Sequence, residues 1–150
     1  MAERDTPSSK RSLKMWIRLL GVTRAAEGTL REFLRVNHDT TLPRFDVLAA
    51  LYRRREGVTM SELSRMLLVS NGNATAVVDR LEKDGLVKRK ASENDRRTVF
   101  VALTPKGLTR FEGLAADHER EVNRLFADLS DEDADALTAT FKRMSKGEAP

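Results

Sequence analysis

Several residue types are absent or scarce in this 150-residue chain, and each scarcity excludes a class of function. It contains no cysteine, which excludes disulfides, zinc–thiolate sites and thiol redox sensing. Its two histidines, His38 and His118, lie on different segments. Because the chain also lacks a glycine-rich phosphate loop, a metal-ligand spacing and a Ser/His/Asp set, we expect neither an enzyme nor a bound cofactor or metal.

Long apolar runs are also missing. None approaches the roughly 18 residues of a membrane span, and residues 1–10 have no apolar signal-peptide core, so we expect a cytoplasmic protein with no membrane partner. The length favours a single domain over 1–150, extended by helical arms.

The net charge of +4 is unevenly distributed. Basic residues outnumber acidic ones over 1–60, and acidic residues predominate over 112–135. Over 86–97, two acids, Glu93 and Asp95, stand against a cluster of cations: Lys88, Arg89, Lys90, Arg96 and Arg97. A basic centre beside an acidic arm indicates an anionic partner.

Apolar periodicity and capping residues predict most of the helices. A long helix is expected over 11–36, and a second over 42–55, with Pro43 in its first turn. Thr59 and Glu62 form a capping box that begins a third helix. After it, Ser70 is the expected N-cap of a fourth helix that runs to residue 84.

The helix expected over 70–84 has two different faces. Ala74, Val77, Val78 and Leu81 recur at the spacing of one buried stripe. The opposite face carries amides, a hydroxyl, small residues and cations, which suit base edges and phosphates in a DNA major groove. Two helices joined by a short turn form a helix-turn-helix.

The remainder of the chain predicts a wing and two further helices. Strands are expected over 86–90 and 98–104, joined by a cationic loop. Thr104 and Pro105 begin a helix that runs to 129, and residue 130 begins the last one. The predicted fold class is therefore mainly α with a small β-hairpin (α+β), a winged helix-turn-helix over 42–104 with dimerisation arms over 11–36 and 105–146.

The predicted partner of this arrangement is double-stranded DNA. The candidate DNA-binding residues are Ser70, Asn71, Asn73, Thr75, Ala76, Arg80, Lys83, Lys88, Arg89, Asn94, Asp95, Arg96 and Arg97. On the helix, the side chains expected to reach bases or nearby phosphates are those of Asn71, Asn73, Thr75 and Arg80. Lys83 is expected to contact a phosphate. In the wing, Arg96 or Arg97 suits a narrow A·T-rich minor groove, with Asp95 bracing one of the two. Such a protein would be associated with the nucleoid.

The arms carry more apolar residues than a small winged-helix core needs. They are Leu13, Trp16, Ile17, Leu125, Phe126, Leu137, Phe141 and Met144. A two-fold homodimer would bury them and would set two half-sites about ten base pairs apart. The alternative is that the arms fold back on their own domain.

The chain resembles the MarR family of bacterial transcription regulators. The resemblance spans nearly the whole chain and is carried by residues 42–48, 60–63, 77–87, 94–97 and 103–107. The Asn94–Arg97 wing, followed by Leu103-Thr104-Pro105-Lys106-Gly107, is its most specific part. It implies a homodimer with intertwined terminal helices that represses by occluding a promoter over a pseudo-palindrome and is released by a small ligand.

The resemblance implies an aromatic carboxylate or its coenzyme A thioester as effector. The expected pocket lies between the first, second and fifth helices, with Trp16 stacking on a ring and Arg44 and His38 meeting an anionic or phenolic group. Each residue has another interpretation, Trp16 as core and His38 as a solvated turn residue.

Three other functions stay open at this point. An enzyme would not lose its function when Arg96 and Arg97 become alanine. A structural DNA-binding protein without sequence preference would need phosphate contacts but not the Asn and Thr side chains of the 70–84 helix. A ligand-independent regulator or an activator has no distinguishing feature in this sequence.

Overall fold

The computed structural model describes residues 7–67, 73–95 and 97–145, which form six helices and one three-stranded sheet. The helices are α1 (Pro7–His38), α2 (Leu42–Arg53), α3 (Met60–Met66), α4 (Ala74–Lys83), α5 (Pro105–Leu125) and α6 (Asp131–Met144). The strands are β1 (Val58–Thr59), β2 (Val87–Ala91) and β3 (Val99–Leu103). The predicted mainly helical fold with a small sheet is confirmed.

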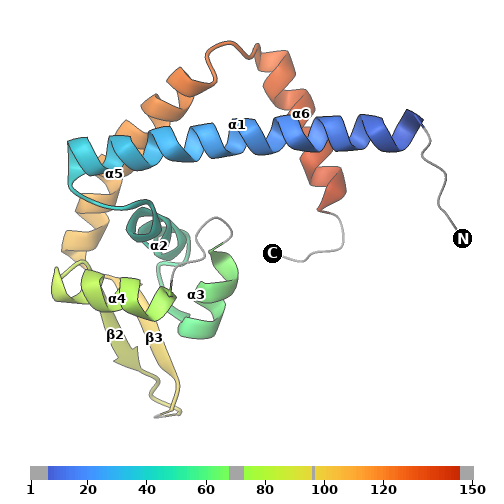
Figure 1. Ribbon diagram of the computed structural model, residues 1–150. Coiled ribbons are helices and arrows are strands. Elements are labelled where there is room, and N and C mark those ends of the chain that lie inside the picture. The colour runs from blue at the N-terminus through green and yellow to red at the C-terminus, as the bar shows by residue number, and fades with distance from the viewer. Residues whose placement is uncertain (1–6, 68–72, 96, 146–150) are drawn as a thin grey trace, which may run out of the picture.

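The long helix α1 runs across the whole width of the molecule, with α2, α3, α4 and the sheet below it (Figure 1). It contacts both α2 and α5, so it joins the arms to the centre of the fold. Within the described ranges, no helix is both long and apolar enough to cross a membrane.

Short-range capping signals place three helix starts where the sequence predicts them. The Thr59 hydroxyl accepts from the Glu62 amide at 3.1 Å, and the Glu62 carboxylate accepts from the Thr59 amide at 3.0 Å. The Thr104 hydroxyl accepts from the Gly107 amide at the start of α5, and Ser130 caps α6. Each cap satisfies amides that have no partner within the helix.

Several predicted helix boundaries are wrong, and α1 spans Pro7–His38 rather than 11–36. Helix α4 begins at Ala74 with Asn73 as its N-cap, not at Ser70, which lies outside the described residues. Helix α2 ends at Arg53 rather than at residue 55, because the Arg54 amide bonds back to Leu51 and closes the last turn. Helix α5 ends at Leu125 rather than at residue 129.

The sheet contains one strand more than the predicted hairpin. Its order is β1–β3–β2, and both pairs are antiparallel. Val58 pairs with Val101 on one side of β3, and Arg89 pairs with the same residue on the other. Gly57, whose φ of 101° favours glycine, leads the chain into β1.

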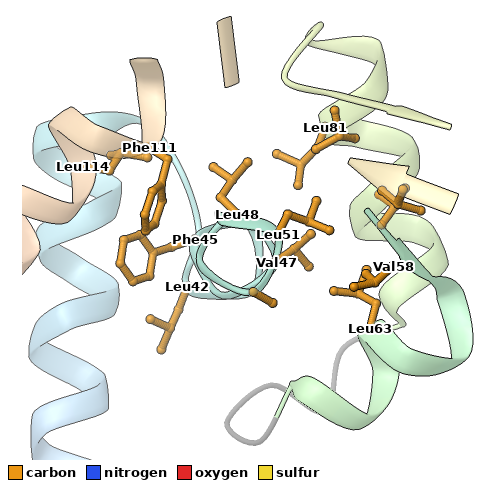
Figure 2. Close-up of a cluster of buried hydrophobic side chains, with 14 of the residues drawn as sticks. Leu42, Phe45, Val47, Leu48, Leu51, Val58, Leu63, Leu81, Phe111 and Leu114 are labelled. Atoms are coloured by element: carbon orange, nitrogen blue, oxygen red, sulfur yellow. The ribbon is translucent and has the colours of Figure 1, made fainter. Parts of the chain in front are cut away.

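The core surrounds α2, which Figure 2 shows end-on. Leu48 and Leu51 point toward α4 and the sheet, and Phe45 points toward Phe111 of α5, with ring centroids 5.7 Å apart. The leucines are fully buried, and each buried leucine or phenylalanine stabilises the fold by about 1.5–3 kcal/mol. The core therefore holds α4 and α5 against the same central helix.

Candidate nucleic-acid interface

Helix α4 presents the two faces that its sequence predicts. Ala74, Val78 and Leu81 are buried against the core, and Val77 is half-buried. The residues of the other face are all exposed: Asn73, Thr75, Ala76, Asp79, Arg80 and Lys83. The packing of the apolar stripe therefore fixes which side chains of α4 face solvent.

Asn73 occupies the N-cap of α4. Its Oδ1 accepts a hydrogen bond from the Thr75 amide at 3.0 Å, which leaves the Nδ2 donors for other partners. The cap satisfies one of the amides left free at a helix start. Asn73 therefore holds the first turn of α4 in addition to offering a donor at its exposed end.

The cations of α4 differ in how they are held. Arg80 Nε lies 3.2 Å from Asp84 Oδ2, an exposed i,i+4 pair of the kind worth only about 0.3–0.5 kcal/mol. An external anion can therefore replace that carboxylate at little cost. Lys83 is exposed and makes no ion pair with any side chain in the described part of the chain.

Arg89 on β2 is engaged rather than free, although the sequence predicts it as a DNA contact. Its guanidinium lies 2.6 Å from Asp79 Oδ1 and 2.9 Å from Glu82 Oε1, both on α4. The hydrogen bond to Asp79 is the main cause that raises the pKa of Arg89 above its ordinary value. Neighbouring Lys88 is exposed.

Asp95 organises the tip of the wing through short polar contacts. Its Oδ1 accepts from the Arg97 amide at 3.0 Å, and its Oδ2 accepts from the Thr98 hydroxyl at 3.2 Å. The brace predicted from Asp95 to an arginine thus acts on the backbone of Arg97, whose side chain is exposed. Asn94 is exposed as well. Asn71 and Arg96, like Ser70, lie outside the described residues.

The predicted effector residues do not gather in one place. Trp16 is half-exposed on α1 and lines neither of the two cavities described below. His38 Nε2 lies 2.9 Å from Asp117 Oδ2 of α5, and the His38 ring packs edge-on against Phe33. Arg44 is half-buried in the first turn of α2. His118 stacks on Phe45 with centroids 4.3 Å apart, and its burial lowers its pKa.

Two cavities open on the helices. A groove of about 910 Å³ lies between α1 and α5 and is lined by mixed charges, including Arg24, Glu32, Glu121 and Arg124. A second cavity of about 830 Å³, here named the α2–α5 cleft, is lined by Asp39, Thr40, Arg44, Leu48, Arg80, Leu81, Asp84, Leu86, Pro105, Lys106, Thr109, Arg110 and Leu114. Among the described residues, no group of three or more acidic or histidine side chains could hold a metal ion.

Asp46 is a carboxyl group with an unusual setting. Its Oδ2 is buried and has no hydrogen-bond partner within the described chain. Burial, with a smaller contribution from Glu27, raises its pKa to about 6. The folded protein binds the proton of Asp46 more tightly than the unfolded chain does. Protonation of Asp46 therefore stabilises the fold at low pH, and this contribution is lost as the pH rises through about 6.

We expect Asp46→Asn to raise the free energy of unfolding by about 1 kcal/mol at pH 8, discounted for the partial solvent contact of this group. The gain should vanish near pH 4, where the wild-type carboxyl is protonated. Urea unfolding across this pH range measures it. The His118 contribution runs in the opposite direction, but it is common to both proteins and cancels in the difference. A gain that is independent of pH would contradict the assignment.

Sequence reasoning missed the side chains that connect the elements. Asp79 and Glu82 of α4 bind Arg89, and Asp84, the C-cap of α4, binds Arg80. Lys106 donates to the Asp84 carbonyl at 3.0 Å. One signal was available for Arg89. Strand alternation puts it on the same face of β2 as buried Val87, which faces α4, whereas Lys88 and Lys90 take the outer face.

The chain is similar to known proteins both in sequence and in fold. Residues 38–98 match the family model described as MarR family. The HTH-type transcriptional regulator MhqR of Bacillus subtilis is 30% identical over 136 residues, which cover 91% of this chain and 92% of that protein. A MarR family regulator from Silicibacter pomeroyi superposes with a TM-score of 0.81 at 28% identity, covering 95% of this chain and 98% of that one. A mutant MarR from E. coli, in complex with operator DNA, gives 0.74 at 27% identity, covering 94% and 99%.

The fold and the exposed helix beside a wing define a winged helix-turn-helix protein of the DNA-binding class. The chain belongs to the MarR family and is a DNA-binding transcription regulator. The predicted family is thereby confirmed.

Proposed function

We propose that the protein is a homodimeric repressor that binds a pseudo-palindromic operator and is released by a small organic acid. The observation that carries the proposal is the fully exposed polar face of α4, capped by Asn73 and set beside the basic wing. The polar face suits a major groove, and Arg97 at the tip of the wing suits the adjacent minor groove. Promoter DNA as the target implies that the protein works at the nucleoid, in the cytoplasm.

The dimer is supported by apolar side chains that the single chain leaves exposed. Ile17 on α1 is 60% exposed, and Phe141 on α6 is 42% exposed. Others on the arms are Leu13, Trp16, Phe126, Leu137 and Met144, and Leu125 is half-buried. No described residue of α6 is buried. Exposed apolar surface of this extent marks an interface, and a second copy of the chain supplies a matching one.

The distribution of charge also supports a second copy of the chain as the partner. The exposed side chains at the start of α1 include Lys10, Arg11 and Lys14, and α6 opens with Asp131, Glu132 and Asp133. A two-fold pair can set the basic start of α1 near the acidic start of the partner's α6. Two copies would also present two α4 helices to half-sites about ten base pairs apart. The similar E. coli protein that binds operator DNA supports sequence-specific binding.

If binding is sequence-specific, substitution of two different side chains of α4 should change DNA affinity in two different ways. Asn73 is a poor probe because its removal also removes the helix cap, so we choose exposed Thr75 and Lys83. Thr75→Val should weaken binding at some operator variants by about tenfold and leave others unchanged, because it removes a hydrogen-bonding group from the base-reading end. Lys83→Ala should weaken all duplexes by a similar factor, because it removes a phosphate contact.

The measurement is binding of each variant to a panel of duplexes selected from a random pool by the wild-type protein. Equal weakening of every duplex by both variants would favour a structural DNA-binding protein without sequence preference. A wild-type protein that selects no common sequence would contradict the proposed function outright.

We further propose that the effector is an aromatic carboxylate or its coenzyme A thioester, bound in the α2–α5 cleft. The cleft has leucine walls from α2, α4 and α5 beside Arg44, which is half-buried and has no carboxylate partner within the described chain. Such a site suits an apolar ring with one anionic group. Because Arg80 of α4 and the C-cap residue Asp84 also line the cleft, an acid bound there would compete for Arg80.

A gel shift on the selected operator tests the effector, with 4-hydroxycinnamate and its coenzyme A thioester added separately. We expect release by at least one compound, and Arg44→Ala should raise the concentration needed by about tenfold, as for a lost charge-assisted hydrogen bond. Arg53→Ala removes an exposed arginine at the end of the same helix and outside both cavities, so it is the matched control and should respond like wild type. Tight binding that neither compound releases would support a ligand-independent regulator.

A further inference from the structure

Arg89 joins the wing to α4 through three hydrogen bonds to two carboxylates. Its two terminal nitrogens bind Asp79 and Glu82 at 2.6 and 2.9 Å, and its backbone amide donates to the second Glu82 oxygen at 3.1 Å. The Arg89 side chain is only 26% exposed, whereas Asp79 is 60% exposed. The planar fork of the guanidinium can bind two separate acceptors at fixed angles, which a single ammonium does not do.

This cluster connects the two elements that dock on DNA in the proposed function. Helix α4 ends at Lys83, and β2 begins only a few residues later, so their relative angle depends on one turn and on contacts across it. The Leu86 amide bonds to the Leu81 carbonyl within that turn. The Arg89 contacts bind Glu82 in the last turn of α4 and Asp79 about one turn further back, which is where they can resist rotation of the wing.

The same cluster also reduces the electrostatic repulsion between α4 and DNA phosphates. Asp79 and Glu82 are exposed carboxylates on the helix that carries the polar face, where uncompensated negative charge would repel phosphates. Arg89 neutralises part of that charge in place. Because these carboxylates neutralise the charge of Arg89, Arg89 is a poor candidate for a phosphate contact.

We propose that Arg89 is a positioning residue that fixes the wing relative to α4, so that both elements meet one operator in register. This inference rests on the proposed docking of α4 and the wing. It replaces the direct DNA contact predicted for Arg89 and assigns Asp79 and Glu82 to the same task.

The deciding variant is Arg89→Lys, because it keeps the charge and removes the two-carboxylate fork. We expect binding to the selected operator to fall at least tenfold and binding to a scrambled duplex to change less than twofold, with the slope of affinity against salt unchanged. A phosphate contact made by Arg89 would behave differently, since lysine also binds phosphate, and Arg89→Lys would then keep nearly full operator affinity. That result would overturn the proposal.

The double variant Asp79→Asn, Glu82→Gln gives an independent test with an opposite sign. Removal of two negative charges from a DNA-binding face should tighten binding to every duplex by simple electrostatics. Loss of the cluster should instead lower the ratio of operator to scrambled affinity. A ratio at or above the wild-type value would overturn the proposal. Glu112→Gln together with Glu119→Gln, exposed acids on α5, is the matched control for charge alone.

The two proposals fail separately. A wild-type protein with no operator preference contradicts the proposed function. A wild-type protein that prefers its operator, with variants that keep the preference, contradicts only the role of Arg89.

Discussion

Gly107→Ala is expected to lower the free energy of unfolding by about 3 kcal/mol, at the upper end for overpacking. A Cβ built on Gly107 would lie 1.9 Å from the carbonyl oxygen and 2.8 Å from the carbonyl carbon of Leu86. Both atoms belong to the backbone and cannot rotate away as a side chain could. The first turn of α5 must therefore move off the α4–β2 turn.

Gly113→Ala on the same helix is the matched control. A Cβ at Gly113 meets nothing within 4 Å, and the position is exposed, so alanine there should stabilise the protein by about 0.5–1 kcal/mol. Chemical unfolding of both variants gives the comparison. If the two substitutions shift stability in the same direction, the close approach of α5 to Leu86 is wrong.

The position of Gly107 also makes the prediction relevant to regulation. Two residues close to Gly107 bind the turn that follows α4: the Thr104 hydroxyl donates to the Gly85 carbonyl at 2.7 Å, and Lys106 donates to the Asp84 carbonyl. The start of α5 is thus bonded to the turn that follows α4. Movement of this turn would be transmitted between α4 and α5, so the effector proposed for the adjacent α2–α5 cleft would have a short route to DNA binding.

Several helix starts could be predicted because their causes are local. The Thr59 capping box, the Thr104–Pro105 start of α5 and the Ser130 cap depend on residues within three positions of each other. The start of α4 was less determined, because both Ser70 and Asn73 are good N-cap residues ahead of the same apolar stripe. The structure selects Asn73, and local spacing alone had no means to choose.

Features that depend on distant segments could not be predicted in this way. Strand β1 is two residues long and exists because Val58 pairs with Val101, far along the chain. For a similar reason, the sequence could not show that the three residues predicted to bind the effector lie apart. Trp16 lies more than five helical turns from His38 along α1, and no periodicity shows which cavity each residue lines. The ion pairs of Arg89 likewise depend on which carboxylates α4 turns toward β2.

The exposed arms carry the second large prediction. If Ile17 and Phe141 lie in the interface of a homodimer, glutamate at either position would bury a charge without a partner, which costs several kcal/mol. We expect Ile17→Glu and Phe141→Glu to run as monomers in sedimentation experiments at concentrations where wild type is dimeric. Their operator affinity should fall by about 10²–10⁴, because a monomer loses the gain of two linked half-sites.

Ile17→Val and Phe141→Leu are the matched controls, since they keep apolar surface and should keep both dimer and affinity. The central fold should survive in the glutamate variants, because neither residue belongs to the buried core around α2. Glutamate variants that keep wild-type mass and affinity would show that these side chains do not form the interface. A wild-type protein that is monomeric yet binds its full operator would contradict the dimer itself, and it would leave the apolar faces of α1 and α6 to a different partner.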